Sequence, residues 1–183
     1  MRSPADVQLI QRRTVHTLVG TQVMAGLGVS SGVAVAVLLA SNVLGRPDLA
    51  GFVQSAQVLG SALLALPAAG LAVKFGRRAG LSLALTLAAV GGLLAIAGAQ
   101  TKFFPFLMLG MALYGGGTTA GLQSRYAAID LAVPERRGRT LSMVVWSTTI
   151  GAVVGPNLVG PAGRFGEWVG IEPLAGPLLF GAV

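Results

Sequence analysis

The side chains that could do chemistry in this chain are few, and they do not form a catalytic set. The sequence has no cysteine and a single histidine, His16, so thiol chemistry and a cysteine–histidine metal site are excluded. The glycine-rich run GGGTT at 115–119 lacks the lysine that a phosphate-binding loop needs. The chain also shows no nucleophile beside a base and no pair of catalytic carboxylates. The residues therefore predict no enzyme, no metal site and no cofactor.

The cations concentrate in one short segment. Lys74, Arg77 and Arg78 lie within five positions, and residues 49–73 before them contain no Asp, Glu, Lys or Arg. Gly76, between them, allows the backbone a tight turn. Arginines beside such a turn can lie at the water boundary of a membrane and pair with acids. We therefore predict that this segment is a charged turn between two apolar helices.

The composition places these side chains in a membrane protein. Hydrophobic residues make up 54% of the 183 residues and charged residues only 10%, whereas an average soluble domain is about a quarter charged. The net charge of +7 does not indicate nucleic acid as a partner, because the cations are confined to short turns between apolar segments. The partners that this pattern predicts are membrane lipid and a small-molecule solute.

Long apolar windows predict the elements that position the polar residues. A helix needs about 20 residues to cross the hydrocarbon core, and the absence of alternation argues against a membrane barrel. The fourth charge-free window ends at Ser124, and we extend its helix to 128. The sequence predicts an all-α transmembrane bundle with five full spans at 17–45, 49–73, 79–101, 103–128 and 140–163.

A sixth apolar window runs from Pro173 to Val183. Eleven residues of helix cover about 16 Å, roughly half of the hydrocarbon core. The sequence therefore predicts an incomplete sixth span at 173–183, and we expect the chain to be a fragment or to end inside a helix.

The distribution of the cations predicts the orientation. Ten of the 13 Lys and Arg residues fall on the side of the amino terminus, the 74–78 turn and the 134–139 loop, and three fall on the other side. Loops rich in Lys and Arg face the cytoplasm. We therefore expect a multi-pass protein of a bacterial inner membrane with a cytoplasmic amino terminus.

Polar side chains inside the spans predict a cavity. Trp146, Thr149 and Asn157 share one face of the fifth span, nearly opposite Gly151, and amides or hydroxyls fall on single faces of other spans. An alternative is that the amides bond neighbouring helices and that Trp146 anchors the membrane interface. The candidate cavity, which has no fixed charge, consists of Gln22, Gln54, Gln57, Thr119, Gln123, Trp146, Thr149 and Asn157.

The segment PAAGLAVKFGRR, residues 67–78, resembles the loop between the second and third helices of the major facilitator superfamily. It matches that loop at Pro67, Ala68, Leu71, Ala72, Gly76, Arg77 and Arg78. In the superfamily an acid in this loop holds the inward face closed, but Val73 stands at its position. We name Asp130 as the candidate replacement partner of Arg77.

The segment GAVVGPNLVG, residues 151–160, resembles a motif in the fifth helix of exporters of the same superfamily. The matching residues are Gly151, Gly155, Pro156 and Gly160. Glycines four positions apart admit close helix contact, and a proline bends the helix. An ordinary packing seam of small residues is the alternative interpretation.

Two further features bear on the resemblance. The loop at 124–139 is similar to the one after the fourth helix of the superfamily, although its charges could also serve only to anchor the topology. The arginine that the superfamily carries early in this helix is absent, which weakens the case for proton coupling.

The resemblance implies the amino-terminal six-helix half of a transporter, truncated within helix six, whose carboxy-terminal half or partner chain is missing. It implies a secondary active transporter, with the second motif favouring export of hydrophobic or amphipathic compounds by alternating access. Uptake of a neutral metabolite, and a non-transporting assembly protein or relic fragment, are the alternatives.

Overall fold

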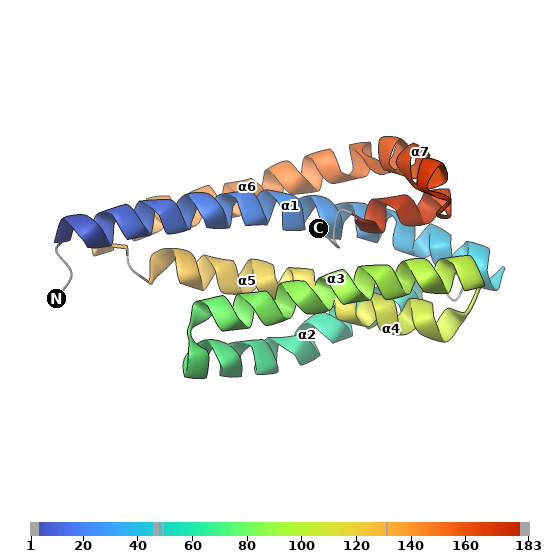
Figure 1. Cartoon of the computed structure of the whole chain (residues 1–183), viewed down its shortest axis with the longest axis horizontal. Helices are drawn as coiled ribbons and strands as arrows, with labels where there is room; N and C mark the ends of the chain where they lie inside the picture. The colour runs from blue at the N-terminus through green and yellow to red at the C-terminus, as the bar shows by residue number, and fades with distance from the viewer. Residues whose placement is uncertain (1–3, 46–47, 49, 131, 180–183) are drawn as a thin grey trace.

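The computed structural model describes residues 4–45, 48, 50–130 and 132–179, which form a bundle of long helices (Figure 1). No strand occurs among these described residues. The α-helices are α1 (Pro4–Leu44), α2 (Ala50–Phe75), α3 (Arg77–Thr101), α4 (Phe104–Tyr114), α5 (Gly116–Ile129), α6 (Arg137–Asn157) and α7 (Val159–Val169). Two short 3-10 helices, η2 (Pro134–Arg136) and η3 (Pro173–Leu178), complete the order.

The first three helices follow the apolar windows, with one extension. α2 and α3 begin and end within two residues of the predicted spans 49–73 and 79–101. α1 begins at Pro4 rather than at residue 17, and its 41 residues span about 60 Å. Proline suits the first turn of a helix, and no further proline or glycine interrupts the polar segment before residue 17.

The later spans are divided. The predicted helix 103–128 is two helices, α4 and α5, which meet at Gly115, where the backbone stays in the right-handed helical region. The predicted helix 140–163 ends at Asn157, and α7 then turns by 61°. Pro156 lies just before this turn, where its missing N–H and its ring weaken the continuing helix. The helix therefore ends where the sequence predicted only a bend.

Three helices of the described residues, α1, α2 and α3, contain apolar segments long enough to cross a membrane, and a fourth span exists if α6 and α7 count as one. α4 and α5 have 11 and 14 residues, so neither alone reaches the length of a span. In place of the predicted sixth span, residues 173–178 form η3, and residues 180–183 lie outside the described part of the chain.

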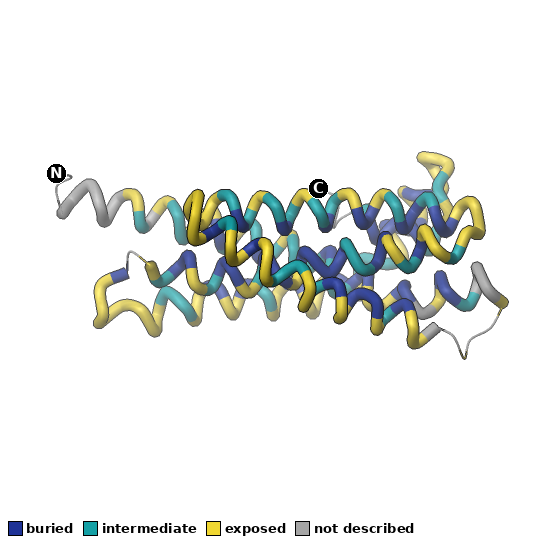
Figure 2. The backbone as a smooth tube through the Cα atoms, turned by 90° about the horizontal axis from the view of Figure 1, so that it is seen from below, coloured by how far each residue is buried: buried dark blue, intermediate teal, exposed yellow. Residues whose placement is uncertain are grey.

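The core lies where α1, α3, α4 and η3 meet. Its members include Val35, Leu39, Met111 and Leu178, and the helices turn their buried residues toward one another and their exposed residues outward (Figure 2). Tyr114 is the largest fully buried side chain, and its hydroxyl donates to the carbonyl oxygen of Gly28 at 2.7 Å. This bond connects α4 to α1 through the middle of the bundle.

Glycines bring α3 and α4 into backbone contact. A Cβ atom added at Gly110 would lie 2.7 Å from the Cα of Ala95, and one added at Gly91 would lie 2.6 Å from the carbonyl oxygen of Gly110. Close approach through small residues is how helices associate in a membrane, where burial of apolar side chains gives little driving force. We call this contact, Gly91, Ala95 and Gly110, the α3–α4 glycine contact.

Candidate functional site

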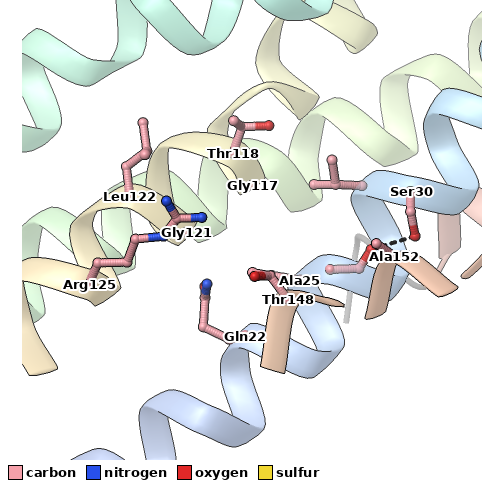
Figure 3. Close-up of a pocket in the computed structure, with 12 residues that line it drawn as sticks. Gln22, Ala25, Ser30, Gly117, Thr118, Gly121, Leu122, Arg125, Thr148 and Ala152 are labelled. Carbon is pink, nitrogen blue, oxygen red and sulfur yellow. Dashed lines mark hydrogen bonds between the residues drawn. The ribbon is translucent and has the colours of Figure 1, made fainter. Parts of the chain in front are cut away.

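A pocket of about 220 Å³ lies between α1, α5 and α6 (Figure 3). It combines small and apolar side chains with a few polar ones. The lining residues are Gln22, Ala25, Gly26, Val29 and Ser30 of α1, Gly117, Thr118, Gly121, Leu122 and Arg125 of α5, and Thr148 and Ala152 of α6.

Arg125 is the charged member of this lining. It lies about one turn before the end of α5, and its guanidinium points into the space between α5 and α1 (Figure 3). The Nε atom of Arg125 is buried and has no hydrogen-bond partner within the described structure. The lining contains no acid, so no carboxylate balances this charge from within the pocket.

Gln22 faces the same space from α1. Its side chain is only 1% exposed, and its Nε2 atom has no hydrogen-bond partner among the described residues. Gln22 and Arg125 therefore bring two unsatisfied N–H donors from different helices to one pocket (Figure 3). Buried donors without partners are costly, which makes such a pair a candidate for binding an acceptor group.

Two other polar groups of the pocket, the hydroxyls of Ser30 and Thr148, are engaged with backbone. The Ser30 hydroxyl lies 2.6 Å from the carbonyl oxygen of Gly26 and 2.9 Å from that of Gly151. The hydroxyl of Thr148 donates to the carbonyl oxygen of Val145. These hydroxyls hold their own helices and the α1–α6 contact. The buried free donors of the lining are therefore those of Arg125 and Gln22, whereas Thr118 is exposed.

Two glycines of the predicted exporter motif pack against two residues of the lining, Gly26 and Ser30. A Cβ atom added at Gly151 would lie 2.7 Å from the Cα of Gly26, and one added at Gly155 would overlap the Ser30 hydroxyl. Both motif glycines are buried against α1. Gly26, Ser30, Gly151 and Gly155 form what we call the α1–α6 glycine contact.

The rest of that motif does not pack. Pro156 and Gly160 are exposed, and a Cβ atom added at Gly160 would meet nothing within 4 Å. Gly160 therefore takes no part in the packing of the described helices, and its place in the motif stays a prediction. The physical reason is the 61° turn after Asn157, which carries α7 away from α1 and onto η3.

This pocket contains little of the predicted cavity. Only Gln22 of the eight lines the pocket. Gln57, Thr119 and Gln123 are buried but not among its lining, and the Thr119 hydroxyl donates to the carbonyl oxygen of Ser61 on α2 at 2.8 Å. Gln54 is half-buried, with an unpartnered Oε1 atom. Thr119 thus bonds a neighbouring helix, whereas the Oε1 atom of Gln57 has no partner within the described structure, so the alternative interpretation of the amides stays a prediction.

The predicted cavity face of α6 points outward. Trp146 is 69% exposed, and Thr149 and Asn157 are exposed as well. The amide Nδ2 of Asn157 donates to the carbonyl oxygen of Val153 in its own helix at 2.7 Å. α6 turns its glycine side onto α1, so the opposite side faces away from the other described helices. The pocket receives Thr148 and Ala152 instead.

The sequence contained a signal for Arg125 that the cavity prediction did not use. It is a cation inside the apolar segment predicted to span the membrane at 103–128. A cation this close to the end of a span often extends to the membrane interface, so the signal is weak. Thr118 and Thr148 carried no comparable signal, because hydroxyl side chains are common along membrane helices.

The charged turn joins three helices at the end of the bundle where α1 begins (Figure 1). Gly76 has a φ of 90°, a conformation that favours glycine, and α3 begins at Arg77 immediately after it. The guanidinium of Arg77 binds the Asp130 carboxylate through two bonds, Nε to Oδ2 at 2.7 Å and Nη2 to Oδ1 at 3.3 Å. Lys74 and Arg78 are exposed. The partner named from the sequence is thus in contact with Arg77.

The arrangement is that of a helical membrane protein with a polar pocket between its spans. No group of three or more His, Cys, Asp or Glu that could hold a metal ion occurs in the described part of the chain. The sequence model of the Major Facilitator Superfamily matches residues 18–183, and the chain belongs to this superfamily. The resemblance in its loops and the all-α fold are thereby confirmed, and membership identifies a multi-pass membrane protein of a transporter family rather than an enzyme.

Relatives in bacteria agree with this assignment. The chain is 36% identical over 177 residues to the uncharacterized MFS-type transporter YddS of Bacillus subtilis, covering 97% of this chain and 41% of that protein. It is 36% identical over 180 residues to the uncharacterized MFS-type transporter YdeG of the same organism, covering 98% of this chain and 42% of the relative. The riboflavin transporter RfnT of Brucella anthropi is 38% identical over 102 residues, which cover 55% of this chain and 25% of RfnT.

The chain thus spans about two fifths of the length of the two Bacillus relatives that it matches. No solved structure matches it significantly.

Proposed function

We propose that this chain is the amino-terminal half of a bacterial inner-membrane secondary transporter that moves a small solute by alternating access. Superfamily membership and the coverage of its relatives support this proposal. Transporters of this kind rock two six-helix halves around a central site. A carboxy-terminal half, in the same natural chain or in a partner, would supply the remainder of that site.

The observation that carries alternating access is the Arg77–Asp130 ion pair. It joins the start of α3 to the end of α5 directly after the turn at Gly76. The beginning of α1, this turn and η2 lie at the same end of the bundle (Figure 1), which we assign to the cytoplasm because most cations fall there. The pair lies within one half, so we propose that it holds the charged turn in place on the cytoplasmic surface that would meet the second half.

We propose export as the direction and an amphipathic compound as the solute. The α1–α6 glycine contact contains the two glycines of the exporter-like segment that pack. The apolar side chains of Ala25, Val29 and Leu122 in the pocket favour a solute with a substantial apolar part. The exposed face of α6, with Trp146 and Thr149, would meet the second half of the transporter.

Cysteine labelling tests the proposal without knowledge of the solute, because this chain has no cysteine of its own. Thr149→Cys in the natural-length protein, freed of any further cysteine, is treated with a membrane-impermeant maleimide in right-side-out and inside-out vesicles. We expect labelling from both sides, because alternating access exposes a central residue to each side in turn. Leu93→Cys, on the exposed surface of α3, is the control and should be labelled from neither side. Labelling of Thr149→Cys from one side alone, or from none, would contradict alternating access.

A further inference from the structure

We propose that the pocket between α1, α5 and α6 recognises an amphipathic organic anion, with the anionic head on Arg125 and Gln22. The apolar body would lie against the small side chains of α1, α5 and α6. This inference deepens the proposed function and rests on it for the transport role of the site. The pocket itself is built within residues 22–152.

The first argument for an anionic solute is the charge of Arg125. Arg125 is half-buried with a buried, unpartnered Nε atom, and a guanidinium beside apolar side chains is stabilised when an anion pairs with it. Asp130, the acid nearest to Arg125 in the sequence, is already bound by two nitrogens of Arg77. The lining of the pocket contains no Asp or Glu. The missing negative charge can therefore come from a solute.

The second argument for an anionic solute is the arrangement of the N–H donors of Arg125 and Gln22. A guanidinium presents its N–H groups as a planar fork that matches the two oxygens of a carboxylate. Gln22 adds a donor from α1, and its 1% exposure means that water does not satisfy it freely. Both side chains point into the same space (Figure 3). Two unpaired donors without a competing carboxylate select an acceptor and disfavour a cationic amine.

The remaining lining residues indicate the size and polarity of the part of the solute that lies outside the head group. Ala25, Val29, Leu122 and Ala152 offer apolar contacts, and about 220 Å³ is room for a head group with a short apolar body. Pockets for drug-sized ligands measure about 300–1,000 Å³, so this pocket favours a smaller compound. This pocket differs from the cavity without fixed charge that the sequence predicts, because Arg125 lines it.

Binding of three eight-carbon probes tests the inference. The natural-length protein is reconstituted in nanodiscs of zwitterionic lipid, and binding of radiolabelled octanoate is measured by equilibrium dialysis against empty nanodiscs. Unlabelled octanoate, 1-octanol and octylamine then compete. They share the apolar chain and differ in the head group. We expect octanoate to compete best, 1-octanol weakly and octylamine least.

Single substitutions test which residues bind the head group of octanoate. Arg125→Gln should weaken octanoate binding about tenfold or more, the loss expected for a hydrogen-bonded charge, and should leave 1-octanol unaffected. Arg125→Lys should retain part of the affinity, because it keeps the charge but loses the fork. Gln22→Leu should weaken octanoate binding by a smaller factor. Arg139→Gln, which removes an exposed cation from α6, is the matched control for general electrostatic attraction.

Three outcomes would overturn the inference: absence of octanoate binding, equal competition by octanol or octylamine, and equal losses in Arg125→Gln and Arg139→Gln. If Arg125→Gln fails to fold, two measurements still test the inference. They are the ranking of the three probes on the unmodified protein and the octanoate affinity of Arg125→Lys. The labelling of Thr149→Cys uses no solute, so alternating access can stand while the anion inference fails, and the reverse also holds.

Discussion

The α3–α4 and α1–α6 glycine contacts are two of several glycine contacts among the described helices, and they differ in what lies beside them. In the α3–α4 glycine contact, Gly91 and Gly110 bring two backbones together with no room for a side chain. In the α1–α6 glycine contact, Gly26 touches Gly151, and the helices then border the pocket that holds Gln22 and Arg125. Glycine by itself therefore indicates only that two helices approach each other closely. A candidate site is indicated where unpaired hydrogen-bond donors lie next to such a contact.

The largest effect should come from filling the α3–α4 glycine contact. Gly110→Leu places atoms where the backbone of Ala95 already lies, and we expect a loss of about 3 kcal/mol or more in the free energy of unfolding. The yield of monodisperse protein in detergent and the thermal melting midpoint measure it. Gly70→Leu is the control, because a Cβ atom there would meet nothing within 4 Å. Equal yields from both variants would contradict a structural role for the contact.

A smaller effect should come from the α1–α6 glycine contact. Gly151→Ala adds one methyl group against the Cα of Gly26, and we expect a cost of about 1–3 kcal/mol. Gly160→Ala makes the same change in open space and should be neutral or stabilise by less than about 1 kcal/mol. Thermal melting of the two variants compares them directly. A melting point for Gly151→Ala equal to that of Gly160→Ala would remove the distinction between the packed and unpacked halves of the motif.

The smallest of these effects on stability should come from the exposed charged turn. Asp130→Asn removes the acceptor of Arg77 from a pair whose side chains are 42% and 40% exposed, so we expect a cost of about 0.2–1 kcal/mol. A double-mutant cycle with Arg77→Gln measures the coupling between the two side chains. Glu135→Gln, an exposed acid in η2, is the matched control. A coupling energy of zero would show that the pair does not hold α3 to α5.

The sequence predicts those parts of the fold that hydrophobicity and charge determine. Residues 74–78 separate two long apolar windows, so the ends of α2 and α3 agree closely with the prediction. The end of α6 was not predicted, because a proline inside an apolar segment can either bend a helix or end it. At Pro156 the helix ends, and α7 packs on η3 beyond it. A single sequence does not show which of the two outcomes such packing favours.

The site was harder to predict than the fold. Helical periodicity placed Trp146 and Asn157 on one face of α6 and the glycines on the other, and the structure has this division. Periodicity does not say which face meets which helix, so it cannot tell that the glycine face meets α1 and that the other face points away from the described helices. The pocket depends on which residues of α1 and α5 oppose Thr148 and Ala152, a register set by the glycine contacts.

The turn of α7 also affects how the protein sits in a bilayer. α7 leaves the direction of α6 by 61° and exposes Phe165 and Trp168, whose ring centroids are 5.9 Å apart. Trp168 is 82% exposed. Tryptophan favours the headgroup region of a membrane, while the cations of the charged turn favour the aqueous side. We therefore expect Trp168 to hold one end of the bundle at the headgroup level and the cations of the charged turn to hold the other end in water. Together they would limit the depth and the tilt of the bundle.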